Sequence, residues 1–439
     1  MVHAAVVLFT RDLRVHDHPA LRAAAAGGGP VLPLFVLDPA ILRRAARNRV
    51  GYLVEALADL RRALRDRGCD LVLREGDTVA ETLRAAEEVR AASVHLSADV
   101  SAFAAARSAR LRAAARRTGV EVREHPGATV VPPGALTPAS GDHYRVFTPY
   151  WRAWEAADWR ALLPAPGRLP APPRMPVGRL PGRRIADLGR GAAASERVRG
   201  GESAARERLR RWLESGLAAY PERCDDLAAA GTSGLSADLR FGCLSPLEVA
   251  RRARGAAGSG PFVRQIAWRD FHHQVTAAFP EMPRRDYRPR DPAWWRDDDD
   301  AFEAWCAGRT GVPIVDAGMR QLLREGFMHN RARLITAAFL TRTLRVRWQR
   351  GADHFHTLLT DGDVADNYGN WQWVAGTGND TRPNRTMNPL RQARRFDPRG
   401  EYVRRYVPEL AGLRPPLVHT PWRAPDRPAD YPPPLVVLD

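Results

Sequence analysis

The chain has 439 residues and a net charge of +17, and all 67 of its Lys and Arg residues are arginines. It is too long for a single hydrophobic core, so we expect two main domains on the usual scale of about 100 to 200 residues each. No stretch approaches the roughly 20 uncharged apolar residues that cross a bilayer, and residues 1–8 lack the basic and apolar regions of a secretory signal, which excludes a membrane-embedded protein and favours the cytoplasm.

The arginine excess favours a polyanionic partner, because guanidinium contacts to phosphate release counterions. Nucleic acid is therefore the first candidate, although a GC-rich genome would produce a similar composition. The four cysteines are far apart in the sequence and form no CxxC pair, so we expect unpaired thiols and no metal site. They are Cys69, Cys224, Cys243 and Cys306.

The first 130 residues alternate between strand-like and helix-like patterns. Apolar runs at 4–9, 31–37, 70–74, 93–97 and 120–124 predict strands, and helices are expected at 19–26, 50–67, 78–91 and between the last two strands. Alternation of this kind predicts a doubly wound α/β domain built on a parallel sheet. We assign residues 1–130 to this domain.

The rest of the chain has a different character. Residues 131–201 are rich in Pro, Gly and Arg and predict an inter-domain connector, with one helical period at 149–163. From residue 202 helical periods dominate, at 206–215, 246–254, 263–278, 315–325 and 331–345, so residues 202–411 are predicted to form an all-helical domain. The proline-rich residues 412–439 predict an extended tail.

The α/β domain lacks the common nucleotide-binding motifs. There is no GxGxxG after the first strand and no GxxxxGK[ST] anywhere. Instead the first strand ends in Thr10-Arg11-Asp12-Leu13-Arg14, with Asp17 following, at the edge where parallel sheets place ligands. On these residues alone, capping of the next helix is the better explanation.

A specific resemblance begins in the helical half. The segment Gly311-Val312-Pro313-Ile314-Val315-Asp316-Ala317-Gly318-Met319-Arg320-Gln321-Leu322, then Phe327-Met328-His329-Asn330-Arg331-Ala332-Arg333, resembles the flavin-domain signature of the photolyase/cryptochrome family. Trp268-Arg269-Asp270-Phe271 upstream, with Asp361-Gly362-Asp363 and Asn370-Trp371-Gln372-Trp373 downstream, follow in the family's order. The resemblance is nearest to class I cyclobutane pyrimidine dimer photolyases, and it implies an α/β antenna domain followed by a helical domain that binds FAD and DNA.

The resemblance also implies a set of FAD-binding residues. Small hydroxyl residues before a helix can donate hydrogen bonds to a phosphate, and the family uses this segment for the FAD phosphates. Arg333 would pair with Asp361 over the flavin ring, and Asn367 would face the flavin N5 position. The residues carried over are Tyr220, Thr232, Ser233, Leu235, Ser236, Arg333, Asp361, Gly362, Asp363 and Asn367.

By the same resemblance, three tryptophans would relay an electron to photoexcited FAD: Trp371, Trp348 and Trp295. Trp268 and Trp373 would form the aromatic walls that hold a dimer flipped out of the duplex. Gln265, Asn330 and Asn367 match positions that act on the dimer or the flavin during repair. The residues expected to bind substrate are Gln265, Trp268, Asn330, Arg331, Leu334, Trp373 and Gln392.

These residues imply a lyase that splits cyclobutane dimers in damaged DNA, acting as a monomer. Asn330-Arg331 stands where (6-4) photolyases and animal cryptochromes carry a His pair, and Asn367 is Asp in plant cryptochromes and Cys in insect ones. Two departures change the pocket: Gln265 replaces a common Glu, and Leu334 replaces a common Met. An amide can only hydrogen-bond, whereas a carboxyl group can also share a proton.

A second chromophore is expected in the α/β domain. The Asn-Glu pair used for folate falls at Ser101-Ala102, so a deazaflavin near Asp99 is expected in preference to a folate, while an empty pocket or a flavin stays open. The alternative functions are a cryptochrome-like blue-light photoreceptor without repair activity and a generic α/β nucleotide enzyme or DNA-binding protein. The latter would explain the charge but not the spacing of the tryptophans.

Overall fold

The structure is a computed structural model that describes residues 3–172, 176–379 and 387–438. The described chain forms two compact units. The first unit comprises Met1–Arg190, Val198–Ala218 and Ser233–Pro280. The second unit comprises Gly191–Arg197, Ala219–Thr232 and Glu281–Asp439.

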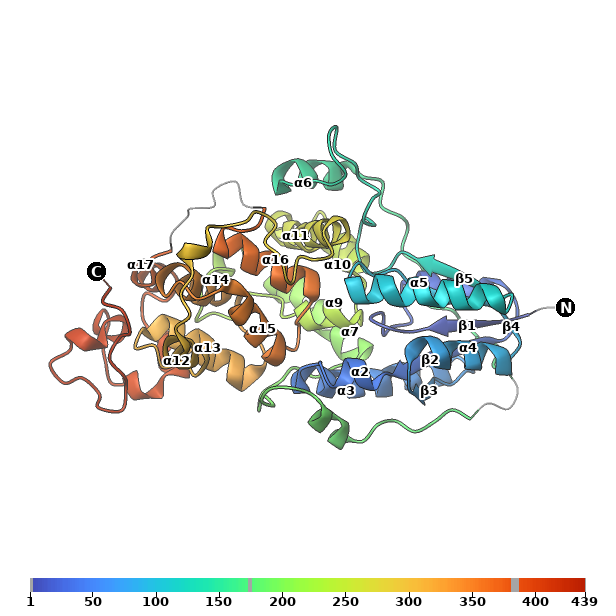
Figure 1. The fold of residues 1–439 in the computed structure, drawn as a ribbon, viewed down its shortest axis with the longest axis horizontal. Coiled ribbons are helices and arrows are strands. Elements are labelled where there is room, and N and C mark those ends of the chain that lie inside the picture. The colour runs from blue at the N-terminus through green and yellow to red at the C-terminus, as the bar shows by residue number, and fades with distance from the viewer. Residues whose placement is uncertain (1–2, 173–175, 380–386, 439) are drawn as a thin grey trace. The chain divides into compact units, whose positions relative to one another are not determined.

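A five-stranded parallel sheet forms the centre of the first unit (Figure 1). Its strand order is β3-β2-β1-β4-β5, so the winding direction changes between β1 and β4. The strands are β1 (Ala4–Leu8), β2 (Val31–Leu37), β3 (Val72–Glu75), β4 (Ala91–Ser97) and β5 (Glu121–His125). All residues of β1 and β2 are buried, as expected for parallel strands covered on both faces. The predicted α/β domain is confirmed.

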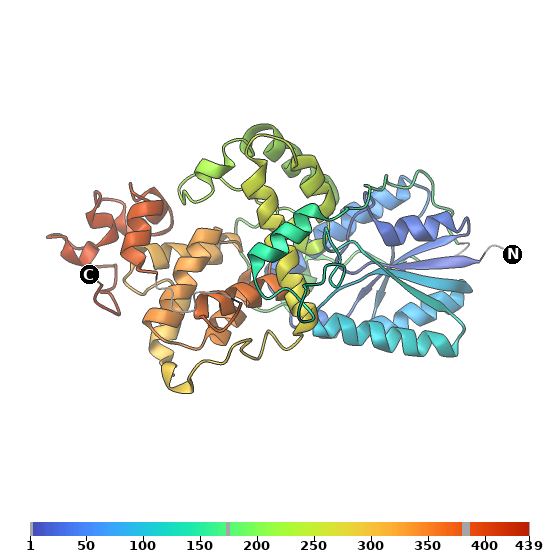
Figure 2. The ribbon, with the colours of Figure 1, turned by 90° about the horizontal axis from the view of Figure 1, so that it is seen from above.

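Helices cover both faces of this sheet, as Figure 2 shows. Each of the predicted helices is present, with ends that differ by a few residues. Pro19 opens the first of them, and the preceding His18 side chain accepts a hydrogen bond from the Leu21 amide. The helices are α1 (Pro19–Ala26), α2 (Pro39–Leu42), α3 (Arg47–Arg65), α4 (Thr78–Glu88) and α5 (Ala102–Arg117).

The first unit also contains the segment predicted as a connector and several helices beyond it. The segment includes α6 (Phe147–Ala156) and η1 (Arg183–Leu188). The later helices are α7 (Glu202–Arg211), the π-helical η2 (Trp212–Gly216), α9 (Ser236–Phe241), α10 (Pro246–Ala253) and α11 (Ser259–Ala278). Helices α7 and α9–α11 therefore belong to the same compact unit as the sheet.

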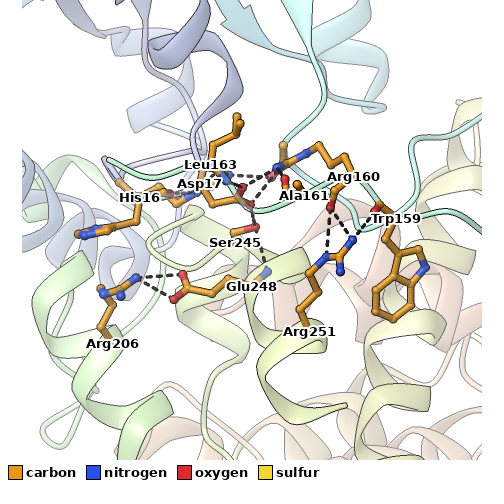
Figure 3. A network of polar contacts seen from close by, with 12 residues as sticks. His16, Asp17, Trp159, Arg160, Ala161, Leu163, Arg206, Ser245, Glu248 and Arg251 are labelled. Carbon is orange, nitrogen blue, oxygen red and sulfur yellow. Dashed lines mark hydrogen bonds and ion pairs between the residues drawn. The ribbon is translucent and has the colours of Figure 1, made fainter. Parts of the chain in front are cut away.

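Asp17 ties the loop after β1 to this later part of the unit (Figure 3). It has a positive φ of 46°. Its carboxylate accepts hydrogen bonds from the Arg160 guanidinium, the Leu163 amide at 3.0 Å and the Ser245 hydroxyl. Asp17 is therefore a structural anchor, and the neighbouring His18 takes the capping role.

The second unit is helical, which confirms the predicted helical C-terminal half. Its elements are α8 (Tyr220–Arg223), η3 (Pro292–Trp294), α12 (Asp299–Cys306), α13 (Pro313–Glu325), α14 (Asn330–Ala338), the π-helical η4 (Phe339–Thr343), α15 (Trp348–Leu358), α16 (Val364–Ala375), α17 (Pro389–Phe396), α18 (Glu401–Tyr406), η5 (Pro408–Leu410), η6 (Leu417–His419) and η7 (Pro421–Arg423). The predicted helix at 331–345 is thus α14 followed by one π turn.

The proline-rich end of the chain is not a free extended tail. It contains η6 and η7, and the fully buried Tyr431 donates a hydrogen bond from its hydroxyl to Asp316 Oδ2 at 2.5 Å. Asp316 also accepts from the Thr310 amide and hydroxyl and from the Gly311 amide. This signature aspartate therefore anchors α13 and the end of the chain. No described helix is long and apolar enough to cross a membrane.

Candidate functional site

Two helices of the second unit present matching faces to one cavity. Residues of α14 at spacings of three and four line one side, and the end of the loop before α16 continues into a similar face on α16. The cavity encloses about 510 Å³ of space not filled by atoms, part of which is open solvent. It is lined by Asn330, Arg333, Leu334, Ala337, Phe355, Leu359, Asp361, Gly362, Asp363, Asp366, Asn367, Asn370, Trp371 and Val374.

An ion pair lies in the wall of this cavity. Arg333 Nη2 and Asp361 Oδ2 are 2.7 Å apart, and Arg333 Nε also donates to the Met328 carbonyl oxygen at 2.7 Å. The Asp361 side chain is 4% exposed, and its other oxygen, Oδ1, is buried without a hydrogen-bond partner in the described structure. A buried carboxylate oxygen without a partner is costly, so Oδ1 indicates a place for a donor from a ligand.

The loop at 361–363 starts α16 and thereby positions Asn367. The Asp363 carboxylate caps the helix by accepting from the amides of Ala365 and Asp366, at 2.8 and 3.2 Å. One turn further along, the Asn367 amide donates to the Ala352 carbonyl oxygen on α15 at 3.0 Å. This bond fixes the orientation of a neutral amide in the cavity wall.

The residues of this cavity fit the polar edge of a flavin ring. An isoalloxazine edge carries both donors and acceptors, and the cavity lining offers a guanidinium donor, the Asp361 Oδ1 acceptor and the Asn367 amide. Much of the remaining lining is apolar, with Leu334, Ala337, Phe355, Leu359, Trp371 and Val374. A flat ring with one polar edge matches a cavity of this composition.

Eight residues predicted for the site lie together in this cavity: Asn330, Arg333, Leu334, Asp361, Gly362, Asp363, Asn367 and Trp371. Of the predicted phosphate ligands, Tyr220 and Thr232 belong to the second unit, and Ser233, Leu235 and Ser236 belong to the first. Tyr220 is buried and opens α8, and Ser236 opens α9. Their shared role stays a prediction.

The tryptophans expected to carry electrons all belong to the second unit. Trp371 is buried in the cavity wall, where its ring packs edge-on against Phe355 and Trp305 at centroid distances of 4.9 and 6.0 Å. Trp348 begins α15, and its indole N–H donates to Asp286 Oδ1 at 2.7 Å. Trp295 directly follows η3 and is half-buried.

The predicted dimer-binding residues of the first unit lie on one face of α11. Gln265 and Arg264 are exposed and Trp268 is half-buried, at helical spacings of three and four. One side of the Trp268 ring is already occupied, because Phe147 stacks on it at a centroid distance of 3.7 Å and an angle of 7°. The side covered by Phe147 is therefore not available to a base.

Asp270 fixes this face to the preceding segment. Its fully buried carboxylate accepts from the Val130 and Val131 amides and from the Trp154 indole, at 2.8, 3.1 and 2.9 Å. Burial raises its pKa to about 6, against the lowering effect of Arg269 and these hydrogen bonds. The motif aspartate therefore holds α11 in place.

Arg331 has an intramolecular partner. It forms a two-pronged ion pair with Asp225 through Nη2 at 2.7 and 2.8 Å, and its guanidinium lies 4.4 Å from the Phe396 ring centroid. A phosphate would have to compete with Asp225 for it. Gln392 lies half-buried on α17 and Trp373 half-buried on α16, and neither lines the cavity. Their substrate contacts stay predictions.

Several cavity residues were not predicted from the sequence. Asp366, Asn370 and Val374 follow Asp363, Asn367 and Trp371 on the same face of α16, so helical spacing from the predicted residues would have found them. Ala337 extends the α14 face in the same way. Phe355 and Leu359 on and after α15 have no such signal, because only the packing of α15 brings them here.

A second polar cluster lies at the switch point of the sheet in the first unit. Arg11 after β1 and Asp99 after β4 are 3.5 Å apart, and Asp12 pairs with His18 at 3.1 Å. Arg107 is buried, and its Nε has no hydrogen-bond partner in the described structure. Ligands of open α/β sheets bind at this position.

Two family models match the chain. The model described as DNA photolyase matches residues 5–172, and the model described as the FAD binding domain of DNA photolyase matches residues 262–439. A deoxyribodipyrimidine photo-lyase of Streptomyces griseus is 49% identical over 444 residues, which cover 99% of this chain and 96% of the relative.

Solved structures agree with these matches. A bacterial class III photolyase from Agrobacterium tumefaciens aligns with a TM-score of 0.93 and 35% identity, over 100% of this chain and 95% of the other. A cryptochrome of Synechocystis aligns with a TM-score of 0.92 and 27% identity, over 100% and 97%. The chain therefore carries the FAD-binding domain of DNA photolyase and belongs to the DNA photolyase family.

Proposed function

We propose that this protein is a deoxyribodipyrimidine photolyase that uses light to split cyclobutane pyrimidine dimers in DNA. The observation that carries the proposal is the cavity between α14 and α16, where Arg333, Asp361, Asn367 and Trp371 meet. The family match and the similarity to named photolyases support it. FAD, when bound in its reduced form, supplies the absorption of light and the electron that starts dimer cleavage.

The chain's own residues would bind the flavin ring and orient it. Arg333 and Asp361 hold the polar edge of the ring, and their ion pair keeps each buried charge compensated. Asn367 presents a neutral amide fixed by the Ala352 carbonyl, so it can donate or accept without adding charge. Trp371 also lines the cavity, where it can pass an electron to the ring.

The dimer would be held by α11. A flipped base would stack on the side of Trp268 that Phe147 does not cover. Gln265 on the same face can hydrogen-bond the carbonyl groups of the dimer, and the exposed Arg264 can contact a phosphate. The proposal includes a monomer that acts in the cytoplasm, where it meets damaged DNA.

The test is a repair assay with the purified protein, a dithiol reductant and an oligonucleotide with one thymine dimer. We expect thymine to be restored under blue light and not in the dark. Trp268→Ala should weaken binding of the damaged strand roughly tenfold, because base stacking on an aromatic ring contributes about 1–3 kcal/mol. Phe103→Ala, an exposed aromatic on α5, is the control. Absent or light-independent repair by FAD-bound protein contradicts the proposal.

A cryptochrome-like photoreceptor is the second candidate. The similarity to the Synechocystis cryptochrome favours it, because that protein aligns over the whole chain. Both functions use the same cavity, so FAD binding does not separate them. A protein that binds FAD and responds to blue light but leaves every dimer intact would support the photoreceptor.

We also propose a second chromophore at the Arg11–Asp99 cluster, a deazaflavin in preference to a folate. The free Arg107 Nε supports an anionic or carbonyl-bearing ligand there. The absorption spectrum of gently isolated protein tests this, because a deazaflavin adds a band in the violet. A spectrum accounted for by FAD alone would leave that site without a chromophore.

A further inference from the structure

Trp294, which directly precedes Trp295 in the chain, lies under two guanidinium groups. The Cζ atoms of Arg290 and Arg345 are 3.8 and 4.6 Å from the centroid of the Trp294 ring. The indole N–H donates to the neutral carbonyl oxygen of Thr341 at 3.2 Å. Burial and the charge of Arg345 both lower the pKa of Arg290, as expected for two cations held at one ring.

The Arg290 guanidinium is held by a backbone carbonyl, and Arg345 is fixed through its own backbone. Arg290 Nη1 donates to the Ala375 carbonyl oxygen at 2.8 Å. Arg345 has a φ of 59°, in the left-handed region that residues other than glycine rarely adopt. Its carbonyl oxygen accepts from the Arg296 amide at 2.8 Å. The cations at Trp294 therefore belong to the built structure of this turn.

Trp348 has the opposite electrostatic environment. Its indole N–H donates to the Asp286 carboxylate at 2.7 Å, and the ring is fully buried. A carboxylate stabilises positive charge on the ring to which it is bonded, and more strongly when water is excluded.

Trp294 and the neighbour of Trp295 both bond to the segment that precedes Trp348 in the sequence. Trp294 bonds to residue 341, and Arg296, the neighbour of Trp295, forms a bridge with Val346. Trp348 then begins α15. Among the described residues no guanidinium lies over the Trp295 ring, and the chain continues from Arg296 into four aspartates at 297–300.

We propose that Arg290 and Arg345 exclude Trp294 from the electron path, so that an oxidised Trp348 takes its electron from Trp295. Loss of an electron leaves positive charge on an indole, which two adjacent cations oppose. The step transfers one electron: Trp295 becomes the radical cation and Trp348 returns to its reduced form. A soluble thiol then donates an electron to Trp295, releases its S–H proton to solvent and becomes a thiyl radical. The inference rests on the proposed light-driven function but concerns residues that this function does not require for binding.

The first experiment needs neither light nor repair. The azide radical, a neutral one-electron oxidant, is generated by pulse radiolysis in the dark with the FAD-bound protein. It takes one electron from an accessible indole, which then loses its N–H proton, and peptide mass spectrometry locates the oxidised products. We expect Trp295 products to exceed Trp294 products by about tenfold, which for a one-electron couple corresponds to about 59 mV.

Two variants assign this preference to charge. R290Q/R345Q should raise the share of Trp294 products about threefold or more, whereas R290K/R345K, which keeps both positive charges near the ring, should retain most of the wild-type preference. Equal oxidation of the two tryptophans in the wild type, or no change in R290Q/R345Q, would overturn the proposal. If the double variant does not fold, R290Q and R345Q singly give the same reading.

The second experiment measures the path itself. In W295F, flash photolysis should show a loss of about tenfold in the long-lived tryptophan radical, although Trp294 is still present. Adding R290Q/R345Q to W295F should recover part of that signal, and W294F alone should change nothing. A near wild-type radical yield in W295F contradicts the inference. Dimer repair with chemically reduced FAD is scored separately, so failure of the proposed function is distinguishable.

Discussion

Asp361 is the residue on which the cavity of the second unit depends most. Its Oδ2 neutralises Arg333, and its Oδ1 is the buried acceptor without a partner. Asp361→Asn should remove the ion pair and lower FAD retention roughly tenfold or more, because breaking such a pair leaves an uncompensated charge. The flavin-to-protein absorbance ratio after gel filtration measures it.

Asp353→Asn is the matched control for this prediction. Asp353 accepts from the Tyr368 hydroxyl at 2.7 Å on α15 and does not line the cavity. It should keep its FAD. Equal FAD content in the Asp361 and Asp353 variants would remove Asp361 from the cofactor site.

Gln265 is the residue at which a substitution should change the rate of the proposed dimer repair. It is exposed on α11, on the same face as Trp268. Gln265→Glu should raise the single-turnover repair rate about threefold or more, because a carboxyl group can share a proton with the developing dimer anion, which an amide cannot. The gain should fall as the pH rises above the pKa of the new carboxyl group. A slower variant at every pH would show that the amide is preferred at this position.

At the scale of elements, α14 depends on a titratable cap. His329 Nδ1 accepts from the Arg331 amide at 3.1 Å, which requires a neutral ring. Burial lowers the His329 pKa to about 4, with Arg331 and Arg333 adding to the effect and Asp225 and Asp226 opposing it. The folded state therefore binds fewer protons than the unfolded state between about pH 4 and 6.5.

The lowered His329 pKa makes the free energy of unfolding decrease as the pH falls. His329 contributes its full stability above about pH 6.5, and the contribution is lost as the pH falls toward 4, by up to about 3 kcal/mol. His329→Asn keeps a capping side chain without the titration. Urea unfolding at pH 7.5, 5.5 and 4.5 should therefore show the wild type losing stability relative to the variant as the solution becomes more acidic. Parallel losses in both proteins would contradict this role for His329.

Sequence periodicity predicted helices and strands well where one face of the element, or the whole element, is buried. The runs at 4–9 and 31–37 correspond to β1 and β2, because parallel strands covered on both faces are continuously apolar. The helix predicted at 331–345 instead ends as α14 at Ala338 and continues as a π turn. A π turn depends on tertiary packing, which period counting does not register.

The residues of the site also form two groups: those that a motif identifies and those that only the fold brings together. Arg333, Asp361 and Asn367 came from motif resemblance, and they meet in one cavity. The partners that tune or support them could not be predicted, since Asp286 and Phe147 are 62 and 121 positions away in sequence from the Trp348 and Trp268 that they contact. Arg331 shows the converse, because its bond to Asp225 was not visible in the motif.

At the scale of the whole molecule, the net charge is +17 with histidine neutral, and arginine is the only residue type that contributes positive charge to it. Affinity for duplex DNA should therefore fall steeply with salt, with a log–log slope of about −0.9 for each phosphate neutralised. Filter binding of damaged and undamaged duplexes between 50 and 200 mM salt measures this slope. Similar slopes for both duplexes, with a constant preference for the damaged one, are expected. A slope near zero would mean that the charge does not serve DNA binding.

The central claim is light-driven cleavage of cyclobutane dimers at this site. The most direct measurement irradiates the reduced, FAD-bound protein with an equimolar mixture of two oligonucleotides, one with a cyclobutane thymine dimer and one with a (6-4) photoproduct, and separates the products by chromatography beside a dark sample. We predict light-dependent restoration of thymine from the cyclobutane dimer alone. Restoration of the (6-4) lesion in its place, or of neither lesion, would contradict the account.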